Sequence, residues 1–106
     1  MADDILDSLE ATIRARRGGD PDASYVARLT AKGRAKIAQK LGEEATETVI
    51  AAMGDDAVEL TKEAADLVFH LLILLADAGL TLDDVRSELA RREGVPGLTE
   101  KASRSE

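Results

Sequence analysis

The chain has 106 residues, a formal net charge of −7, 44% hydrophobic residues, 2% aromatic residues and no cysteine. Its length predicts one domain spanning residues 1–106, and its hydrophobic content favours a packed core over disorder. The acidic charge argues against a general nucleic-acid-binding protein, and the absence of cysteine excludes a disulfide framework and a thiolate metal site.

The first half of the chain begins with two predicted helices. Residues 4–17 carry apolar side chains at helical spacing, and the Gly- and Asp-rich residues 18–22 predict a loop. Ser24 is a candidate N-cap for a short helix that runs past Leu29, and Gly33 predicts a bend after it. The apolar stripe of the first helix is Ile5, Leu6, Leu9 and Ile13.

Two longer helices are predicted next, at residues 34–53 and 56–78. A turn at residues 54–56 would fold them antiparallel, with Gly54 ending the first and an Asp capping the second. The expected core stripe of the first of these helices is Ile37, Leu41, Ala45, Val49 and Ala52. No stretch alternates as a strand would, so the prediction is an all-α bundle of four to five helices.

A last helix is predicted from a capping box at Thr81 through Arg92. Its apolar stripe is Leu82, Val85 and Leu89. A polar C-terminal tail is expected from about residue 94. The acidic N-terminus lacks the basic start and apolar core of a signal peptide, which predicts a cytoplasmic protein.

The longest apolar run, residues 67–76, is interrupted only by His70. It is too short to cross a membrane, which takes about 20 residues, so no membrane partner is expected. Because the run is apolar around the whole helix, we expect a second copy of the chain to cover part of it in a homodimer. The alternative is a central helix in a monomeric bundle.

Five carboxylates in two short clusters are the most informative feature of the sequence. Glu43, Glu44 and Glu47 form the first cluster, and Glu63 and Asp66 form the second. Residues three apart share a helix face, so an antiparallel hairpin brings the clusters together. Such acids repel each other unless a cation lies among them, and oxygen ligands suit Mg²⁺ or Mn²⁺. The pattern predicts metal-assisted chemistry on a polyphosphate.

Each candidate also has a simpler interpretation. The acids could form only a solvated face, although the first cluster has no basic residue three or four positions later. Lys36 and Lys40 could bind terminal phosphates, or only improve solubility and pair locally with Glu43. His70 is either a hydrogen-bonded core residue, which we favour, or a ligand or proton acceptor. Glu59 shares this face and is expected to be exposed.

The spacing Glu-Glu-x-x-Glu followed by Glu-x-x-Asp resembles the all-α nucleoside triphosphate pyrophosphohydrolases, which include MazG-type enzymes and dimeric dUTPases. Residues 40–48 and 63–72 are similar to signatures of the phosphoribosyl-ATP pyrophosphatases, as are the upstream segment 24–33 and the tail 100–104. The resemblance covers most of residues 5–104. One departure is Pro96, where the family pattern predicts Ser.

This resemblance implies an all-α, MazG-like helical bundle that a second subunit completes by dimerisation. It also implies a Mg²⁺-dependent enzyme that hydrolyses phosphoribosyl-ATP to phosphoribosyl-AMP and pyrophosphate, the second step of histidine biosynthesis. Mn²⁺ is a possible substitute for Mg²⁺. By motif position, the implied metal ligands are Glu44, Glu47, Glu63 and Asp66. Glu43 would orient or deprotonate water, and Lys36 and Lys40 would stabilise the departing pyrophosphate.

Two rival functions stay open at this point. A house-cleaning (d)NTP pyrophosphohydrolase would use the same chemistry on a different nucleotide, such as dUTP. A non-catalytic helical dimerisation module would carry its acids only as a soluble face.

Overall fold

The computed structural model describes residues 4–94 of the chain, and these residues form helices without any strand. The all-α prediction is therefore confirmed, with boundaries close to those expected. The tail predicted from about residue 94 lies almost wholly outside the described residues, as does Pro96. The helices are α1 (Ile5–Arg16), α2 (Tyr25–Lys32), α3 (Arg34–Ala52), α4 (Ala57–Asp77) and α5 (Leu82–Arg92).

Side-chain caps explain where most of the helices begin. Asp4, Ser24 and Asp56 each accept a hydrogen bond from a backbone N–H in the first turn of α1, α2 and α4 respectively. Thr81 forms the predicted capping box at the start of α5. Gly33 has a φ of 99°, which favours glycine and lets α2 end and α3 begin within one residue.

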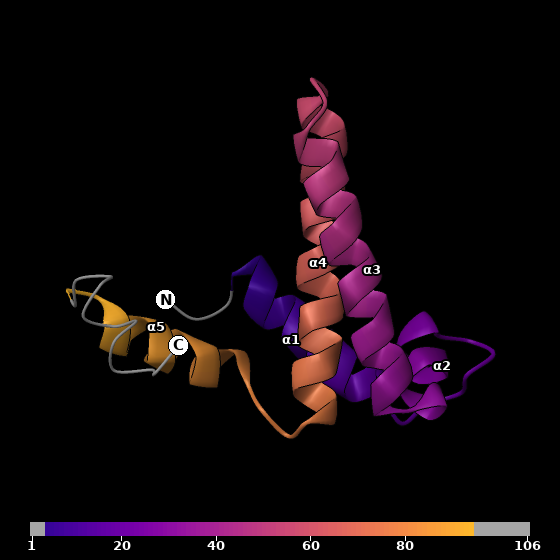
Figure 1. The fold of residues 1–106 in the computed structure, drawn as a ribbon. Coiled ribbons are helices and arrows are strands. Elements are labelled where there is room, and N and C mark those ends of the chain that lie inside the picture. Colours follow the sequence, from indigo (N-terminus) through magenta and orange to yellow (C-terminus); the bar gives the residue numbers. More distant parts are fainter. Residues whose placement is uncertain (1–3, 95–106) are drawn as a thin grey trace.

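The antiparallel hairpin of α3 and α4 is the frame of the molecule (Figure 1). Helix α1 packs on α4 and α2 packs on α3, so the core lies at the end of the hairpin where α3 begins and α4 ends. Ile13, Leu29, Ile37 and Ile73 bring one buried side chain from each of these four helices. Helix α5 buries no residue and lies apart from the hairpin (Figure 1).

Four residues expected in apolar stripes prove to be exposed. Ile5, Val49 and Leu89 are 77%, 61% and 59% exposed, and the assignment of Val49 to the core stripe was wrong. Ala52, at the end of α3, is exposed as well. The spacing identified helix faces correctly, but neither α1 nor α2 reaches the far half of the hairpin, and α5 meets the core at its first residue, Leu82. Whether an apolar residue is buried therefore depends on how near it lies to the core at the base of the hairpin.

The apolar run of α4 is covered mainly by its own chain. Leu72 and Ile73 are buried, while Val68 and Leu71 are only slightly more than one-third exposed. Val68 and Leu71 remain exposed, so the expectation that a second copy of the chain covers part of this run stays a prediction. No single helix in residues 4–94 is long and apolar enough to span a membrane; α4 and α5 meet that criterion only as a pair bent by 107°.

Asp77, at the end of α4, joins three helices. Its carboxylate accepts hydrogen bonds from Arg17, just after α1, and from Arg34, the first residue of α3. The Arg34 guanidinium also donates to the Asp77 backbone carbonyl. These bonds fix the base of the hairpin, and the hydrogen bond from Arg34 is the main reason that the pKa of Asp77 is lowered.

We predict that Asp77→Asn lowers the free energy of unfolding by about 1–2 kcal/mol at neutral pH, because it weakens two charge-assisted bonds. A carboxyl whose pKa is lowered by folding stabilises the protein fully at pH values above 3.8, its ordinary pKa. That stabilisation is lost as the pH falls through the pKa of the folded state. The difference in the free energy of unfolding between the wild type and Asp77→Asn should therefore become smaller as the pH is lowered. Urea unfolding at several pH values measures it.

Asp55→Asn, in the exposed turn between α3 and α4, is the matched control and should leave the stability nearly unchanged. Equal effects of the two substitutions would show that Asp77 does not join these helices.

Candidate metal centre between α3 and α4

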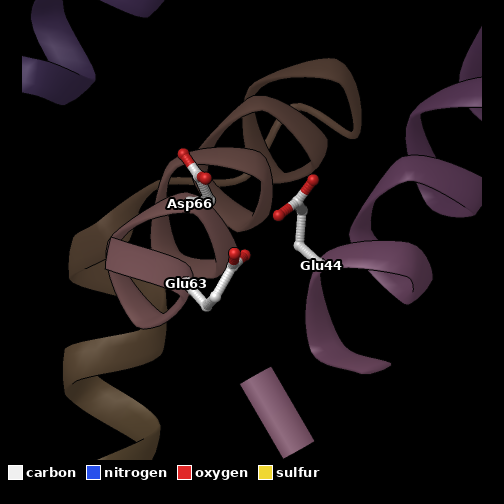
Figure 2. Close-up of side chains that lie close together, drawn as sticks. All are labelled: Glu44, Glu63 and Asp66. Carbon is white, nitrogen blue, oxygen red and sulfur yellow. The ribbon is translucent and has the colours of Figure 1, made fainter. Parts of the chain in front are cut away.

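Three carboxylates meet between the two helices of the hairpin. Glu44 reaches from α3 toward Glu63 and Asp66, which lie one turn apart on α4 (Figure 2). One oxygen from each residue lies within 4.8 Å of the other two. Glu44 is only 8% exposed, although it is an acid. We call this group the carboxylate triad.

Two oxygens of the carboxylate triad lack the partners that buried polar atoms normally have. Oε1 of Glu44 and Oε1 of Glu63 are buried without a hydrogen bond. A buried carboxylate oxygen without a donor is costly, and a neighbouring carboxylate adds repulsion. A hard divalent cation removes both costs, because carboxylate oxygens are the ligands that Mg²⁺ and Mn²⁺ prefer. The residues present therefore fit such a cation.

The electrostatics of Glu63 show the same crowding. Its pKa is raised to about 7, first because its carboxyl lies within hydrogen-bonding reach of the Glu59 carboxyl, and then because of desolvation and the Glu47 carboxyl. A proton between neighbouring acids relieves repulsion when no cation is bound. Because ligands bind metals in their deprotonated form, a cation would compete with that proton.

The other acids of the first cluster are placed differently. Glu47 is exposed and adjoins Glu63, but it is not a member of the carboxylate triad. Glu43 accepts hydrogen bonds from Gln39 (2.9 Å) and Lys40 (3.2 Å), which lower its pKa. The same contact with Glu43 raises the pKa of Lys40 and keeps its ammonium charged. The local pairing considered for Lys40 is therefore present.

His70 is the hydrogen-bonded core residue that we favoured from the sequence. It is 5% exposed, and both ring nitrogens have partners, at the Tyr25 hydroxyl and the Asp66 backbone carbonyl. Sequence reasoning missed Tyr25, because no spacing pattern links residues 45 positions apart. Glu59 is exposed, as expected, and lies beside Glu63 on the helix face that the sequence indicated.

Comparison with known proteins gives one consistent result. The family model described as phosphoribosyl-ATP pyrophosphohydrolase matches residues 6–93. A protein of Novosphingobium aromaticivorans named phosphoribosyl-ATP pyrophosphatase is 64% identical over 102 residues, covering 96% of this chain and 95% of the relative. Proteins of the same name from Rhizorhabdus wittichii and Azospirillum brasilense are 66% and 53% identical, covering 93% and 94% of this chain and 93% and 90% of the relatives.

We predict that Glu63→Gln stabilises the protein in EDTA at and above about pH 7. A carboxyl whose folded pKa is raised from 4.5 to about 7 makes stability fall as the pH rises between these values, because the folded state keeps a proton that the unfolded state has lost. Glutamine cannot ionise and escapes this loss. Thermal unfolding between pH 4.5 and pH 8 measures the effect.

Glu93→Gln, at the exposed end of α5, is the matched control and should follow the wild-type pH dependence. If Glu63→Gln unfolds at or below the wild-type unfolding temperature at every pH tested, the carboxylates do not destabilise the folded protein by repelling each other.

Proposed function

The chain belongs to the phosphoribosyl-ATP pyrophosphohydrolase family, and from this membership we propose that it is a Mg²⁺-dependent enzyme of histidine biosynthesis. It hydrolyses phosphoribosyl-ATP to phosphoribosyl-AMP and pyrophosphate. The observation that carries the metal dependence is the carboxylate triad, whose two buried oxygens have no other partner.

The Mg²⁺ site would be formed by Glu44, Glu63 and Asp66, with Glu47 beside Glu63 as a fourth ligand. When bound, the ion supplies charge neutralisation for the triphosphate and polarises the reacting phosphoryl group. Mn²⁺ accepts the same oxygen ligands and is the expected substitute. The ligands come from both helices of the hairpin, so the site requires α3 and α4 to stay in register.

The other residues with a proposed catalytic role lie along α3, before and beside the carboxylate triad: Lys36, Lys40 and Glu43. Attack of water on the α-phosphorus breaks the bond to the oxygen that bridges the α- and β-phosphates, and pyrophosphate leaves with the bridging oxygen. Lys36 and Lys40 stabilise the charge that develops on this leaving group. Glu43 orients the attacking water. Its lowered pKa makes it a weak base, which favours orienting the water over deprotonating it.

We further propose a homodimer of single-domain chains in the cytoplasm. The radius of gyration is 15.9 Å, against about 13 Å for a globular domain of this length. The far end of the hairpin carries Val49, Ile50, Met53 and Val58, each at least 61% exposed, and we call them the tip patch. Apolar side chains gathered in this way favour contact with a second copy of the chain.

We predict that phosphoribosyl-ATP hydrolysis requires Mg²⁺ and that Glu63→Gln or Glu44→Gln lowers kcat by at least about 100-fold, because each removes a ligand charge. The assay follows pyrophosphate release and identifies phosphoribosyl-AMP by chromatography, with and without EDTA. Glu93→Gln is the control and should keep wild-type activity.

A substrate panel separates the rival functions. Hydrolysis of dUTP or other dNTPs without turnover of phosphoribosyl-ATP would identify a house-cleaning pyrophosphohydrolase. Absence of both activities, together with no Mg²⁺ binding in calorimetry, would indicate a non-catalytic dimerisation module. Either result overturns the proposed function.

We predict that Ile50→Glu, within the tip patch, shifts the protein from dimer to monomer, because it buries a charge in the subunit contact. Light scattering coupled to size-exclusion chromatography measures the mass, and circular dichroism checks that the helices remain. Leu89→Glu makes the same change at an exposed apolar residue of α5 and should leave the dimer intact. An unchanged mass for Ile50→Glu would exclude the tip patch as the dimer contact.

A further inference from the structure

A partly buried chain of hydrogen bonds, centred on His70, joins α2 to α4 next to the carboxylate triad. His70 lies one turn after Asp66 on α4, and its Nδ1 is 2.8 Å from the Asp66 backbone oxygen. Its Nε2 is 2.7 Å from the hydroxyl of Tyr25, the first residue of α2. The chain therefore links a residue of α2 to the backbone of a residue of the carboxylate triad.

The direction of these bonds follows from their chemistry. A carbonyl oxygen only accepts, so Nδ1 of His70 must carry the proton that it donates to Asp66. In the neutral ring Nε2 then accepts, and the Tyr25 hydroxyl donates to it. The pKa of Tyr25 is raised, chiefly by desolvation, which keeps this hydroxyl protonated. Both ring nitrogens of the buried His70 side chain therefore have hydrogen-bond partners.

The packing around His70 fixes the ring as well as its hydrogen bonds. The rings of Tyr25 and Phe69 meet the imidazole edge to face, with centroids 5.6 Å and 5.4 Å away. These are the only aromatic residues of the chain apart from the histidine itself. An aliphatic side chain would fill the same volume without a desolvation cost. A histidine at this position therefore indicates a role for its two hydrogen bonds, to Tyr25 and to the Asp66 backbone.

The consequence for the carboxylate triad is geometric. Glu44 comes from α3, whereas Glu63 and Asp66 come from α4, so a small rotation or slide of α4 changes every distance between them. Apolar packing is non-directional, so it does not by itself specify one hydrogen-bonded register of α4. A hydrogen-bond chain with fixed donors and acceptors resists such a slide strongly, since its energy falls steeply with misalignment.

We propose that Tyr25 and His70 are positioning residues that hold the Asp66 segment of α4 in the register that divalent cation binding requires. The inference rests on the proposed metal-dependent function, and it adds two residues that do not touch the ion. The Asp66 backbone carbonyl orients the His70 ring within α4, the Tyr25 hydroxyl ties that ring to α2, and the carboxylate triad thereby keeps the spacing at which its oxygens converge. Outer partners of this kind commonly change metal affinity about 10–100-fold when they are removed.

The test compares Mg²⁺ binding by titration calorimetry, without substrate, in wild type, Tyr25→Phe and His70→Leu. Tyr25→Phe keeps the ring and its packing but removes the donor, and we expect Mg²⁺ affinity to fall about tenfold. His70→Leu removes both bonds and should lower it further. Steady-state assays should show a matching rise in the Mg²⁺ concentration required for half-maximal rate, with an unchanged KM for phosphoribosyl-ATP at saturating Mg²⁺.

The double variant tests whether the two residues act in one chain. If Tyr25 acts only through His70, adding Tyr25→Phe to His70→Leu should cause no further loss of affinity. Ile13→Val trims the core by one methyl group far from the acids and controls for a general loss of stability. It should lower the unfolding temperature without changing Mg²⁺ affinity.

Several results would overturn the positioning role. Wild-type Mg²⁺ affinity in the folded Tyr25→Phe and His70→Leu proteins would reduce the pair to ordinary core residues. Additive losses in the double variant would contradict a single chain, and a raised KM with unchanged Mg²⁺ affinity would indicate direct contact with substrate. Failure of the wild type itself to bind Mg²⁺ would instead remove the proposed metal function, so the two failures are distinguishable.

Discussion

The crowding of carboxylates between α3 and α4 is the constraint on which the rest of the structure depends. Glu44 and Glu63 each leave a buried oxygen without a partner, and Glu63 retains a proton to a pH near 7 because other acids surround it. Left to themselves, two helices carrying these charges would separate or turn away from each other. The fold must therefore hold the hairpin closed by interactions located elsewhere.

Those interactions lie at the base of the hairpin, where α3 begins and α4 ends. Ile37 and Ile73 are fully buried where α1 and α2 cover the hairpin, and Asp77 ties the end of α4 to two arginines. Charge and core are thus separated along the hairpin: the base supplies stability and the middle carries the acids. The far end, where α1 and α2 do not reach, is left with the exposed apolar side chains of the tip patch.

Periodicity predicted the helices and the shared face of Glu63 and Asp66, because both follow from local geometry. It could not predict that Val49 is exposed, since burial depends on how far neighbouring helices extend. It also could not predict that Glu44, and not Glu47, completes the carboxylate triad, because the packing of α3 against α4 decides which acid faces Glu63 and Asp66. The substrate followed only from the family resemblance of residues 40–48 and 63–72, because the spacing of the acids by itself fits other nucleoside triphosphate pyrophosphohydrolases as well.

The position of the carboxylate triad also explains why stability and metal binding are linked in this fold. A cation that binds the folded chain and not the unfolded chain stabilises it by mass action, and it does so most where the empty site is least favourable. Pairing Glu44 with a basic side chain would remove that cost, but it would occupy the oxygens that the cation needs. A fold that keeps these acids unpaired must place its stabilising contacts away from them, which the cluster at Asp77 and the core at the base of the hairpin achieve.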